Sequence, residues 1–561
     1  MIKKSLLEGL AAILICCMTG CSDNDSDIGS KPDVENEPIY DLKDVTVSDV
    51  GYISVVDYYS MMVKKATEGN NDQNHTLLEY AQKQLELAKE QELFLNDSLN
   101  NVYGTNGEAY GENWDHPDGG GKNRIMWFQY CTLRYKAKGA LGKEEELSEL
   151  VVWPYGNTWD PQPDHVIVGC HCTILSNTER PTKFDDFEVD TDLFMFASFA
   201  HSFSQEALVV IPDYEGYGST HGNTHPYIDR EILAHQVVEG TKAAIAWYEN
   251  KFKDGLRKGW KSVALGYSQG GNVAAGVLRY VQEHNETSLN MAGAVCGGGC
   301  YSPEETLKSY IKTGRIYMPI AAALMLKSAV DTQKDLKGLR LADLCTQEFI
   351  ETGIFDWIQE KNYITEEIQN MLLFHSASKG GFLMYCWSED DNKFLPFDNE
   401  HIRNGDRLRE WNLEYGTASS YCTPEAMFTP EVLEFFKTGQ ISNMEDPARN
   451  ALYQKLVALR EVLERNSLTY GWSPKAGSGF TFFHSWKDEV VPYVNLQEVD
   501  KRWDVTTPMP YYRYSYENEN TYLHVATGTA FFVKYCGDLV NEILDGKWEG
   551  GRKVQPGAEL V

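Results

Sequence analysis

The chain has 561 residues, of which 42% are hydrophobic and 12% aromatic, and this content is ample for one large domain with insertions or for several smaller domains. Its 82 acidic and 51 basic residues give a net charge of −31. That charge repels phosphate backbones and no basic cluster offsets it, so the composition argues against nucleic acid as a partner.

The first residues follow the pattern of a bacterial lipoprotein signal. Lys3 and Lys4 precede an apolar stretch, Leu10 to Met18, that is too short to span a bilayer as a mature helix. Small residues come just before Cys21, and the segment resembles a lipobox, in which this cysteine is diacylated and becomes the mature N-terminus. We expect residues 1–20 to be a signal peptide and Cys21 to carry lipid. A plain secretory signal cleaved nearby is the alternative.

Residues 21–45 are polar and acidic, with too few apolar side chains to pack, and they are expected to form a tether. The run Ser22 to Asp27 resembles the export signal of some Gram-negative lipoproteins, although a solvated linker explains it equally well. No later apolar run approaches membrane-spanning length, so the expected membrane contact is the N-terminal lipid. We expect an outer membrane lipoprotein exposed at the surface, with the periplasmic side as the alternative.

Residues 46–123 are expected to form an N-terminal helical segment, to which the sequence assigns no chemistry. Apolar residues recur at helical spacing among charged ones from Val47 to Asn101. A glycine-rich loop at Gly119 to Gly121 follows.

Residues 124–301 alternate between strand-like and helical patterns, which predicts the first part of an α/β core. The strand-like runs are Arg124 to Tyr135, Leu150 to Tyr155, His165 to Gly169, Ala207 to Ile211, Ser262 to Leu265 and Met291 to Val295. Helical patterns run from Arg230 to Phe252 and from Gly271 to about Glu283. Short buried strands separated by helices predict a doubly wound, mostly parallel sheet.

Residues 302–472 are mostly helical and are expected to form a cap inserted above the carboxyl edge of that sheet. The clearest helical patterns are Glu304 to Thr313, Leu341 to Gln359, Thr365 to Phe374 and Pro447 to Asn466. A separate domain with its own function is the alternative. Residues 473–561 then resume the core, with strand-like runs at Phe480 to Phe483 and Tyr511 to Tyr516 and a closing helix from Val525 to Leu544.

A candidate nucleophile lies where a buried strand meets a helix. Gly266-Tyr267-Ser268-Gln269-Gly270-Gly271 follows an apolar strand and opens an apolar helical run. A sharp turn there would strain Ser268, expose its hydroxyl at the edge of the sheet and point the N–H of Gln269 toward a developing oxyanion. The alternative is a glycine-rich turn that only packs.

A serine hydroxyl needs a histidine to take its proton, and that imidazole needs a carboxylate to orient it. For a serine at a strand-to-helix corner the chain order is serine, acid, histidine. Asp488 lies on a turn after a strand-like run and is the candidate acid, with Glu489 as the neighbour to exclude and an ordinary acidic surface turn as the alternative. Among the 13 histidines only His524 lies beyond Asp488, and it is the candidate base. His484 precedes the acid and is expected to be structural.

The cysteines do not indicate a metal site or a disulfide scaffold. Nine cysteines remain beyond Cys21, an odd number, so at least one thiol is free. In Cys170-His171-Cys172, adjacent residues of a strand would point to opposite faces, so the histidine would not share a side with the two cysteines. We expect no metal and no other cofactor.

Three segments together resemble the secretory lipases of the lipase A type and related α/β-hydrolase esterases. They are Pro212-Asp213-Tyr214-Glu215-Gly216-Tyr217-Gly218 with His225-Pro226-Tyr227, the glycine-flanked serine turn, and the segment from His484 to Pro492. The resemblance implies an α/β-hydrolase fold with a Ser268, Asp488 and His524 triad and a cap over the acyl chain.

The resemblance also implies an oxyanion hole and a substrate pocket. Asp213 would join the N–H of Gln269 in the oxyanion hole, as in lipase A-like enzymes, or would merely cap the following turn. The commoner donor is a backbone N–H after the third strand, where Cys172 replaces the glycine that relatives often carry. Tyr214 and Tyr267 are the candidate substrate contacts.

The leading functional hypothesis is therefore hydrolysis of a small-molecule, lipid or glycan ester through an acyl-enzyme on Ser268. A serine peptidase of the oligopeptidase type is the first alternative, but no blade repeat of a propeller precedes the core. A surface binding protein that has lost catalysis is the second, and the presence of all three triad residues argues against it.

Overall fold

The computed structural model describes residues 39–68, 72–103, 127–155, 162–186, 191–201, 207–388, 393–398, 420–504, 513–515 and 523–553. The expected signal peptide, the lipid-bearing Cys21, most of the tether and the loop at Gly119 to Gly121 lie outside the described residues. Among the described helices, none has an apolar stretch long enough to cross a bilayer.

A ten-stranded sheet forms the centre of the fold, with the strand order β1-β2-β3-β5-β4-β6-β7-β11-β12-β13. The strands are β1 Thr46–Ser54, β2 Trp127–Lys138, β3 Glu144–Tyr155, β4 His165–Cys170, β5 Ala207–Pro212, β6 Lys261–Tyr267, β7 Met291–Gly297, β11 Gly479–Phe483, β12 Arg513–Ser515 and β13 Gly551–Lys553. Every pairing from β5 to β13 is parallel, whereas β1, β2, β3 and β5 pair antiparallel. The mostly parallel sheet expected from the sequence is confirmed.

Strand β1 corrects the expectation that the helical segment begins at residue 47. Thr46 pairs with Arg134 of β2 and Ile53 pairs with Phe128, and helix α2 starts only at Val55. Threonine, valine and isoleucine favour an extended backbone, and the open edge of β2 supplies hydrogen-bond partners that a helix would not use. A distant strand therefore decided the conformation of this segment.

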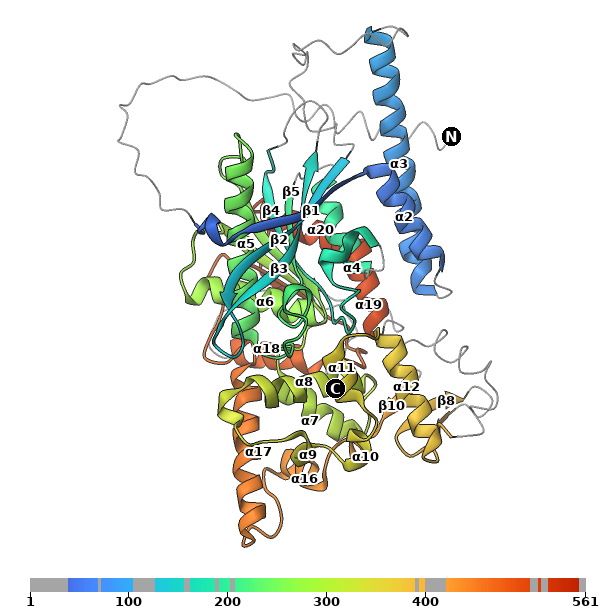
Figure 1. Ribbon diagram of the computed structural model, residues 1–561, viewed down its shortest axis with the longest axis vertical. Coiled ribbons are helices and arrows are strands. Elements are labelled where there is room, and N and C mark those ends of the chain that lie inside the picture. The colour runs from blue at the N-terminus through green and yellow to red at the C-terminus, as the bar shows by residue number, and fades with distance from the viewer. Residues whose placement is uncertain are drawn as a thin grey trace. The chain divides into compact units, whose positions relative to one another are not determined.

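Helices cover both faces of the sheet, and the strands alternate their side chains between these two layers (Figure 1). The helices are α2 Val55–Glu68, α3 Asp72–Tyr103, α4 Thr191–Ser198, α5 Arg230–Lys251, α6 Gln269–Glu283, α18 Val494–Asp504, α19 His524–Ala530 and α20 Cys536–Leu544, with a π-helical turn, Phe531–Tyr535, joining the last two. Ala264 of β6 packs in the core with α5, α6 and α18, whereas its neighbours Val263 and Leu265 pack in the core with α2, α3, α4 and α20. Burial on both faces explains the continuous apolar run of this strand.

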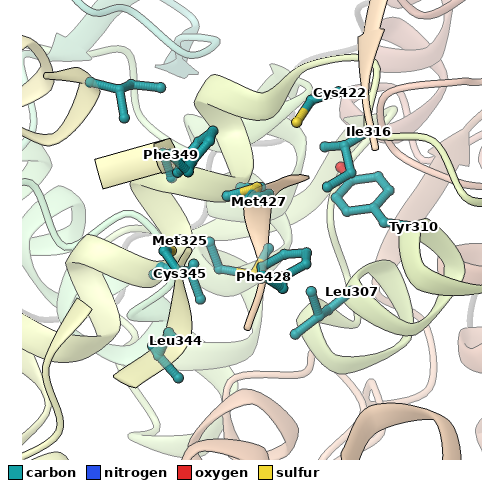
Figure 2. Packing of buried hydrophobic residues seen from close by; sticks show 14 of the residues in the cluster. Leu307, Tyr310, Ile316, Met325, Leu344, Cys345, Phe349, Cys422, Met427 and Phe428 are labelled. Carbon is teal, nitrogen blue, oxygen red and sulfur yellow. The ribbon is translucent and has the colours of Figure 1, made fainter. Parts of the chain in front are cut away.

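The segment between β7 and β11 has its own hydrophobic core, part of which Figure 2 shows. Its helices are α7 Pro303–Thr313, α8 Pro319–Thr332, α9 Leu341–Leu344, α10 Gln347–Ile350, α11 Ile354–Glu360, α12 Thr365–Ser378, α15 Pro424–Met427, α16 Pro430–Thr438 and α17 Pro447–Arg465. It also contains a three-stranded antiparallel sheet, β10-β8-β9, that the mostly helical expectation missed. Those strands are β8 Met384–Ser388, β9 Lys393–Pro396 and β10 Ser420–Cys422. We call the whole segment the cap.

The single helix expected from Leu341 to Gln359 is instead three short helices. The chain leaves the helical conformation at Cys345, which forms an isolated β-bridge with Phe428, and Thr346 caps the next helix by accepting the N–H of Phe349. Gly353 then adopts a φ of 88°, a left-handed conformation that glycine takes without steric cost. The bridge at Cys345 and the left-handed Gly353 therefore break the predicted helix into three.

Polar contacts tie the cap to the core at two places. The Tyr310 hydroxyl of α7 donates a hydrogen bond to the carbonyl of Val490 at 2.6 Å. Elsewhere, the buried Lys361 ammonium donates to the carbonyls of His221 and Asn223 at 3.0 and 2.8 Å. Burial lowers the pKa of Lys361 to about 8. These bonds join the cap to the loop after β5 and to the turn after β11.

Candidate active site

Ser268 occupies a strained turn between β6 and α6. Its φ of 55° and ψ of −122° are rare for a residue with a side chain, and its backbone N–H donates to the carbonyl of Gly297 on β7. The Ser268 hydroxyl does not cap α6. The turn therefore presents the oxygen at the carboxyl edge of the sheet, which is the geometry expected for a nucleophile.

The flanking glycines are needed because β4 passes very close to this turn. A Cβ atom at Gly270 would lie 1.9 Å from the carbonyl oxygen of Cys170, and one at Gly266 would lie 2.5 Å from the same oxygen. Real Cβ atoms do not approach backbone oxygens this closely. Any larger residue at either position would push β4 and the serine turn apart.

The three residues predicted to form a proton relay lie in hydrogen-bond contact. The Ser268 Oγ is 2.9 Å from His524 Nε2, and His524 Nδ1 is 2.7 Å from Asp488 Oδ2. The side chains of His524 and Asp488 are 6% and 0% exposed, which excludes most bulk water from the relay. Such an arrangement lets the imidazole take the serine proton while the carboxylate stabilises the charged ring.

The acid turn fixes the orientation of the carboxylate. Asp488 Oδ1 accepts the backbone N–H groups of Val490 and Val491 at 3.1 and 2.7 Å, which leaves Oδ2 for the imidazole. The buried His484 donates from Nε2 to the carbonyl of Val491 at 2.9 Å. Burial lowers the pKa of His484, so the ring beside Asp488 stays neutral and its role here is structural.

The environment of His524 favours the protonated ring. Burial by itself lowers the pKa of this imidazole, but the charge and hydrogen bond of Asp488 together with the charge of Glu489 outweigh burial and raise it. A general base works best with a pKa near the operating pH. A raised pKa makes His524 a stronger base toward the serine hydroxyl than an isolated imidazole.

Gln269 lies at the first turn of α6, where the backbone N–H groups have no acceptor within the helix. Its side-chain amide donates to Nε2 of the buried His225 at 2.5 Å, while Nδ1 of His225 donates to the carbonyl of Glu215 at 2.7 Å. Burial lowers the pKa of His225 to about 3, so the ring stays neutral. The chain Gln269–His225–Glu215 links the serine turn to the loop after β5. The role of His225 was not predicted, although it lies in a motif that carried the resemblance.

The two alternative oxyanion partners occupy different environments. Both carboxylate oxygens of Asp213 accept hydrogen bonds, from Ser148 at 2.6 Å and from the hydroxyl and N–H of Thr182 at 2.7 and 2.9 Å. These bonds hold Asp213 between β3 and the segment after β4, and its part in the oxyanion hole stays a prediction. Cys172 lies two residues after Cys170, whose carbonyl oxygen lies against the serine turn. Cys172 therefore remains a candidate to donate its backbone N–H to the oxyanion.

The two candidate substrate contacts are both largely buried. The Tyr267 hydroxyl donates to the carbonyl of His524 at 2.7 Å, so this residue supports the histidine, and its contact with substrate stays a prediction. Tyr214 stacks on His171 with ring centroids 4.1 Å apart, and its φ of 63° places it at a tight turn. These contacts pack Tyr214 beside His171, and its contact with substrate stays a prediction.

Comparisons with known proteins agree with this geometry. Residues 178–339 match the secretory lipase family. The rice cell wall degrading esterase LipA from Xanthomonas oryzae has a similar structure, with a TM-score of 0.53 and 17% identity over 76% of this chain and 92% of that one. A putative hydrolase from Legionella pneumophila is similar with a TM-score of 0.52 and 16% identity, over 78% of this chain and 91% of that one. No curated protein matches the sequence.

These similarities, together with the mostly parallel sheet and the serine turn between β6 and α6, decide the fold. The chain has the α/β-hydrolase fold. The match of residues 178–339 adds a similarity to secretory lipases over that part of the chain. The expected resemblance to secretory lipases is thereby confirmed.

Two other features of the chain concern metal and thiol chemistry. Across the described ranges, no group of three or more histidine, cysteine or acidic side chains is placed to hold a metal ion. The nine cysteines of these ranges form no disulfide bond with one another.

Proposed function

We propose that the chain hydrolyses carboxylic esters through an acyl-enzyme on Ser268. The observation that carries the proposal is the continuous relay from Ser268 through His524 to Asp488, with contacts of 2.9 and 2.7 Å. The match of residues 178–339 to secretory lipases supports an ester as the bond that is cleaved.

In the proposed reaction, the Ser268 oxygen attacks the ester carbonyl carbon while His524 Nε2 takes the hydroxyl proton. The tetrahedral oxyanion would accept hydrogen bonds from the backbone N–H groups of Gln269 and Cys172. Collapse breaks the carbon–oxygen bond to the alcohol, which leaves with the proton held by His524. A water molecule, deprotonated by the same imidazole, then releases the acid and restores the serine.

The cap is proposed to shape the pocket for the acyl or alcohol part of the substrate. Its first helix, α7, touches the acid turn through Tyr310, and its α11 end touches the loop after β5 through Lys361. These contacts to the acid turn and to the loop after β5 support a role of the cap in binding substrate. A lipid ester and an acylated glycan are the substrate classes proposed.

The first experiment compares p-nitrophenyl acyl esters of increasing chain length with aminoacyl p-nitroanilides. We expect the esters to turn over faster at every chain length, with an optimum set by the cap. Faster turnover of the anilides would assign the same relay to a serine peptidase instead. The enzyme with Ser268→Ala serves as the background for both substrate series.

We also propose that the mature chain is an exported lipoprotein, held at the outer membrane by lipid on Cys21. The lipobox-like sequence before this cysteine supports the anchor, and the match to a secretory family supports export. Cells fed an alkyne fatty acid should label the full-length protein but not its Cys21→Ser variant, which should also leave the membrane fraction. Equal labelling of the two proteins would contradict the anchor.

A further inference from the structure

Two adjacent carboxylates on the turn after β11 hold two different groups of His524. Asp488 contacts the imidazole at Nδ1, whereas Glu489 Oε2 accepts the backbone N–H of His524 at 2.9 Å. His524 is the first residue of α19, so its N–H has no acceptor within that helix. The turn therefore holds both the ring and the main chain of the same residue.

We propose that Glu489 is a positioning residue, which fixes the backbone of the catalytic histidine and adds a second negative charge beside its imidazole. This inference rests on the proposed function of Ser268, Asp488 and His524. It gives a role to Glu489, which the sequence excluded as the catalytic acid in favour of Asp488.

The geometry explains why a second anchor is needed. Asp488 alone would restrain the imidazole but would leave the Cα of His524 free to shift, because the ring joins the backbone through two rotatable bonds. Glu489 fixes the N–H side of the residue, and the Tyr267 hydroxyl fixes its carbonyl at 2.7 Å. With the main chain held on both sides, Nε2 can stay 2.9 Å from the Ser268 oxygen. A displacement of about 1 Å in a reacting group costs roughly a hundredfold in rate.

The charged and titratable groups around His524 determine in which direction Glu489 shifts the pKa of its imidazole. The acid turn contributes the two carboxylates and the neutral His484, and the serine turn contributes the hydroxyls of Tyr267 and Ser268. The two carboxylates favour the imidazolium, whereas burial opposes it. Removing the charge of Glu489 must lower the pKa of His524, and the neutral base must then persist to lower pH.

The test uses two variants that separate charge from hydrogen bonding. Glu489→Gln keeps an oxygen that can accept the His524 N–H but removes the charge. We expect its plateau kcat to stay within about twofold of wild type, while the acid limb of the kcat/KM profile moves to lower pH. Glu489→Ala removes both, and we expect kcat to fall roughly tenfold with KM unchanged. Glu498→Gln on α18 is the control, because it makes the same change of charge away from the relay and should leave the profile in place.

A second readout does not depend on turnover. NMR titration of the histidine side chains in ¹³C-histidine-labelled protein, assigned with His524→Gln, should show a lower pKa for His524 in Glu489→Gln than in wild type. A His524 titration that coincides in the two proteins would overturn the charge role. Equal losses of kcat in Glu489→Gln and Glu489→Ala would overturn the anchoring role.

These outcomes are distinct from failure of the proposed function. If wild type cleaves esters and Ser268→Ala does not, unchanged profiles in the Glu489 variants reject the inference alone. If wild type cleaves neither esters nor anilides, the proposed function fails, and the NMR titration still decides whether Glu489 raises the pKa of His524.

Discussion

Replacing Ser268 by alanine is expected to lower kcat for ester hydrolysis about a millionfold, because the attacking oxygen is lost while the rest of the site stays in place. A residual rate of about 10³ to 10⁴ over the uncatalysed reaction should remain from the oxyanion hole and substrate binding. KM should change little, since the hydroxyl contributes to the transition state and not to ground-state binding. Initial rates on the preferred p-nitrophenyl ester measure both constants.

A fluorophosphonate probe gives an independent check of the same residue. The probe should label wild type once per chain, and labelling should disappear in Ser268→Ala. Ser262→Ala is the matched control, because Ser262 is a fully buried serine on β6, the strand before the serine turn, and its hydroxyl donates to the carbonyl of Leu289 at 2.7 Å. Labelling that persists in Ser268→Ala, or that disappears in Ser262→Ala, would contradict the assignment of the nucleophile.

Asp488→Asn is expected to lower kcat about ten thousandfold with little change in structure. The Oδ1 position accepts two backbone N–H groups, so the amide oxygen of asparagine should take that place. The NH₂ group would then face His524 Nδ1, which must become the acceptor. The ring proton moves to Nε2, and His524 can no longer take the proton of Ser268.

The tautomer gives this prediction a signature beyond the rate. In ¹⁵N NMR spectra, neutral His524 should carry its proton on Nδ1 in wild type and on Nε2 in Asp488→Asn. Asp538→Asn on the exposed face of α20 makes the same chemical change away from the relay and should alter neither the rate nor the tautomer. A wild-type rate in Asp488→Asn would show that another group orients the histidine.

The sequence predicted the sheet well because its strands are buried on both faces. The apolar runs at β4, β5, β6 and β7 needed no knowledge of their partners, since any strand in that position must be apolar throughout. The helices α5 and α17 were also predicted, as apolar and helical patterns over Arg230 to Phe252 and Pro447 to Asn466. Segments whose conformation depends on a distant partner were not predicted. Strand β1 forms because it pairs with the edge of β2, and residues 344 to 346 leave the helix because their backbone pairs with residues 427 to 429.

In the candidate site, too, the residues found from local sequence patterns were predicted and the contacts between distant residues were not. Chain order and the strand-to-helix context singled out Ser268, Asp488 and His524, and these are the residues whose side chains meet. The hydrogen-bond partners of Asp213 and Tyr267, which are Ser148 and the His524 carbonyl, were not predicted, because they lie far away along the chain. His225 and Glu489 were passed over for the same reason.

The sequence by itself determined the class of fold and the residue types that carry the chemistry, because hydrophobic periodicity and a glycine-flanked serine are local properties. Only the tertiary structure decided which polar groups surround the relay. A hydrogen bond depends on the distance between two atoms in space, and 35 residues separate Glu489 from the backbone N–H that it holds.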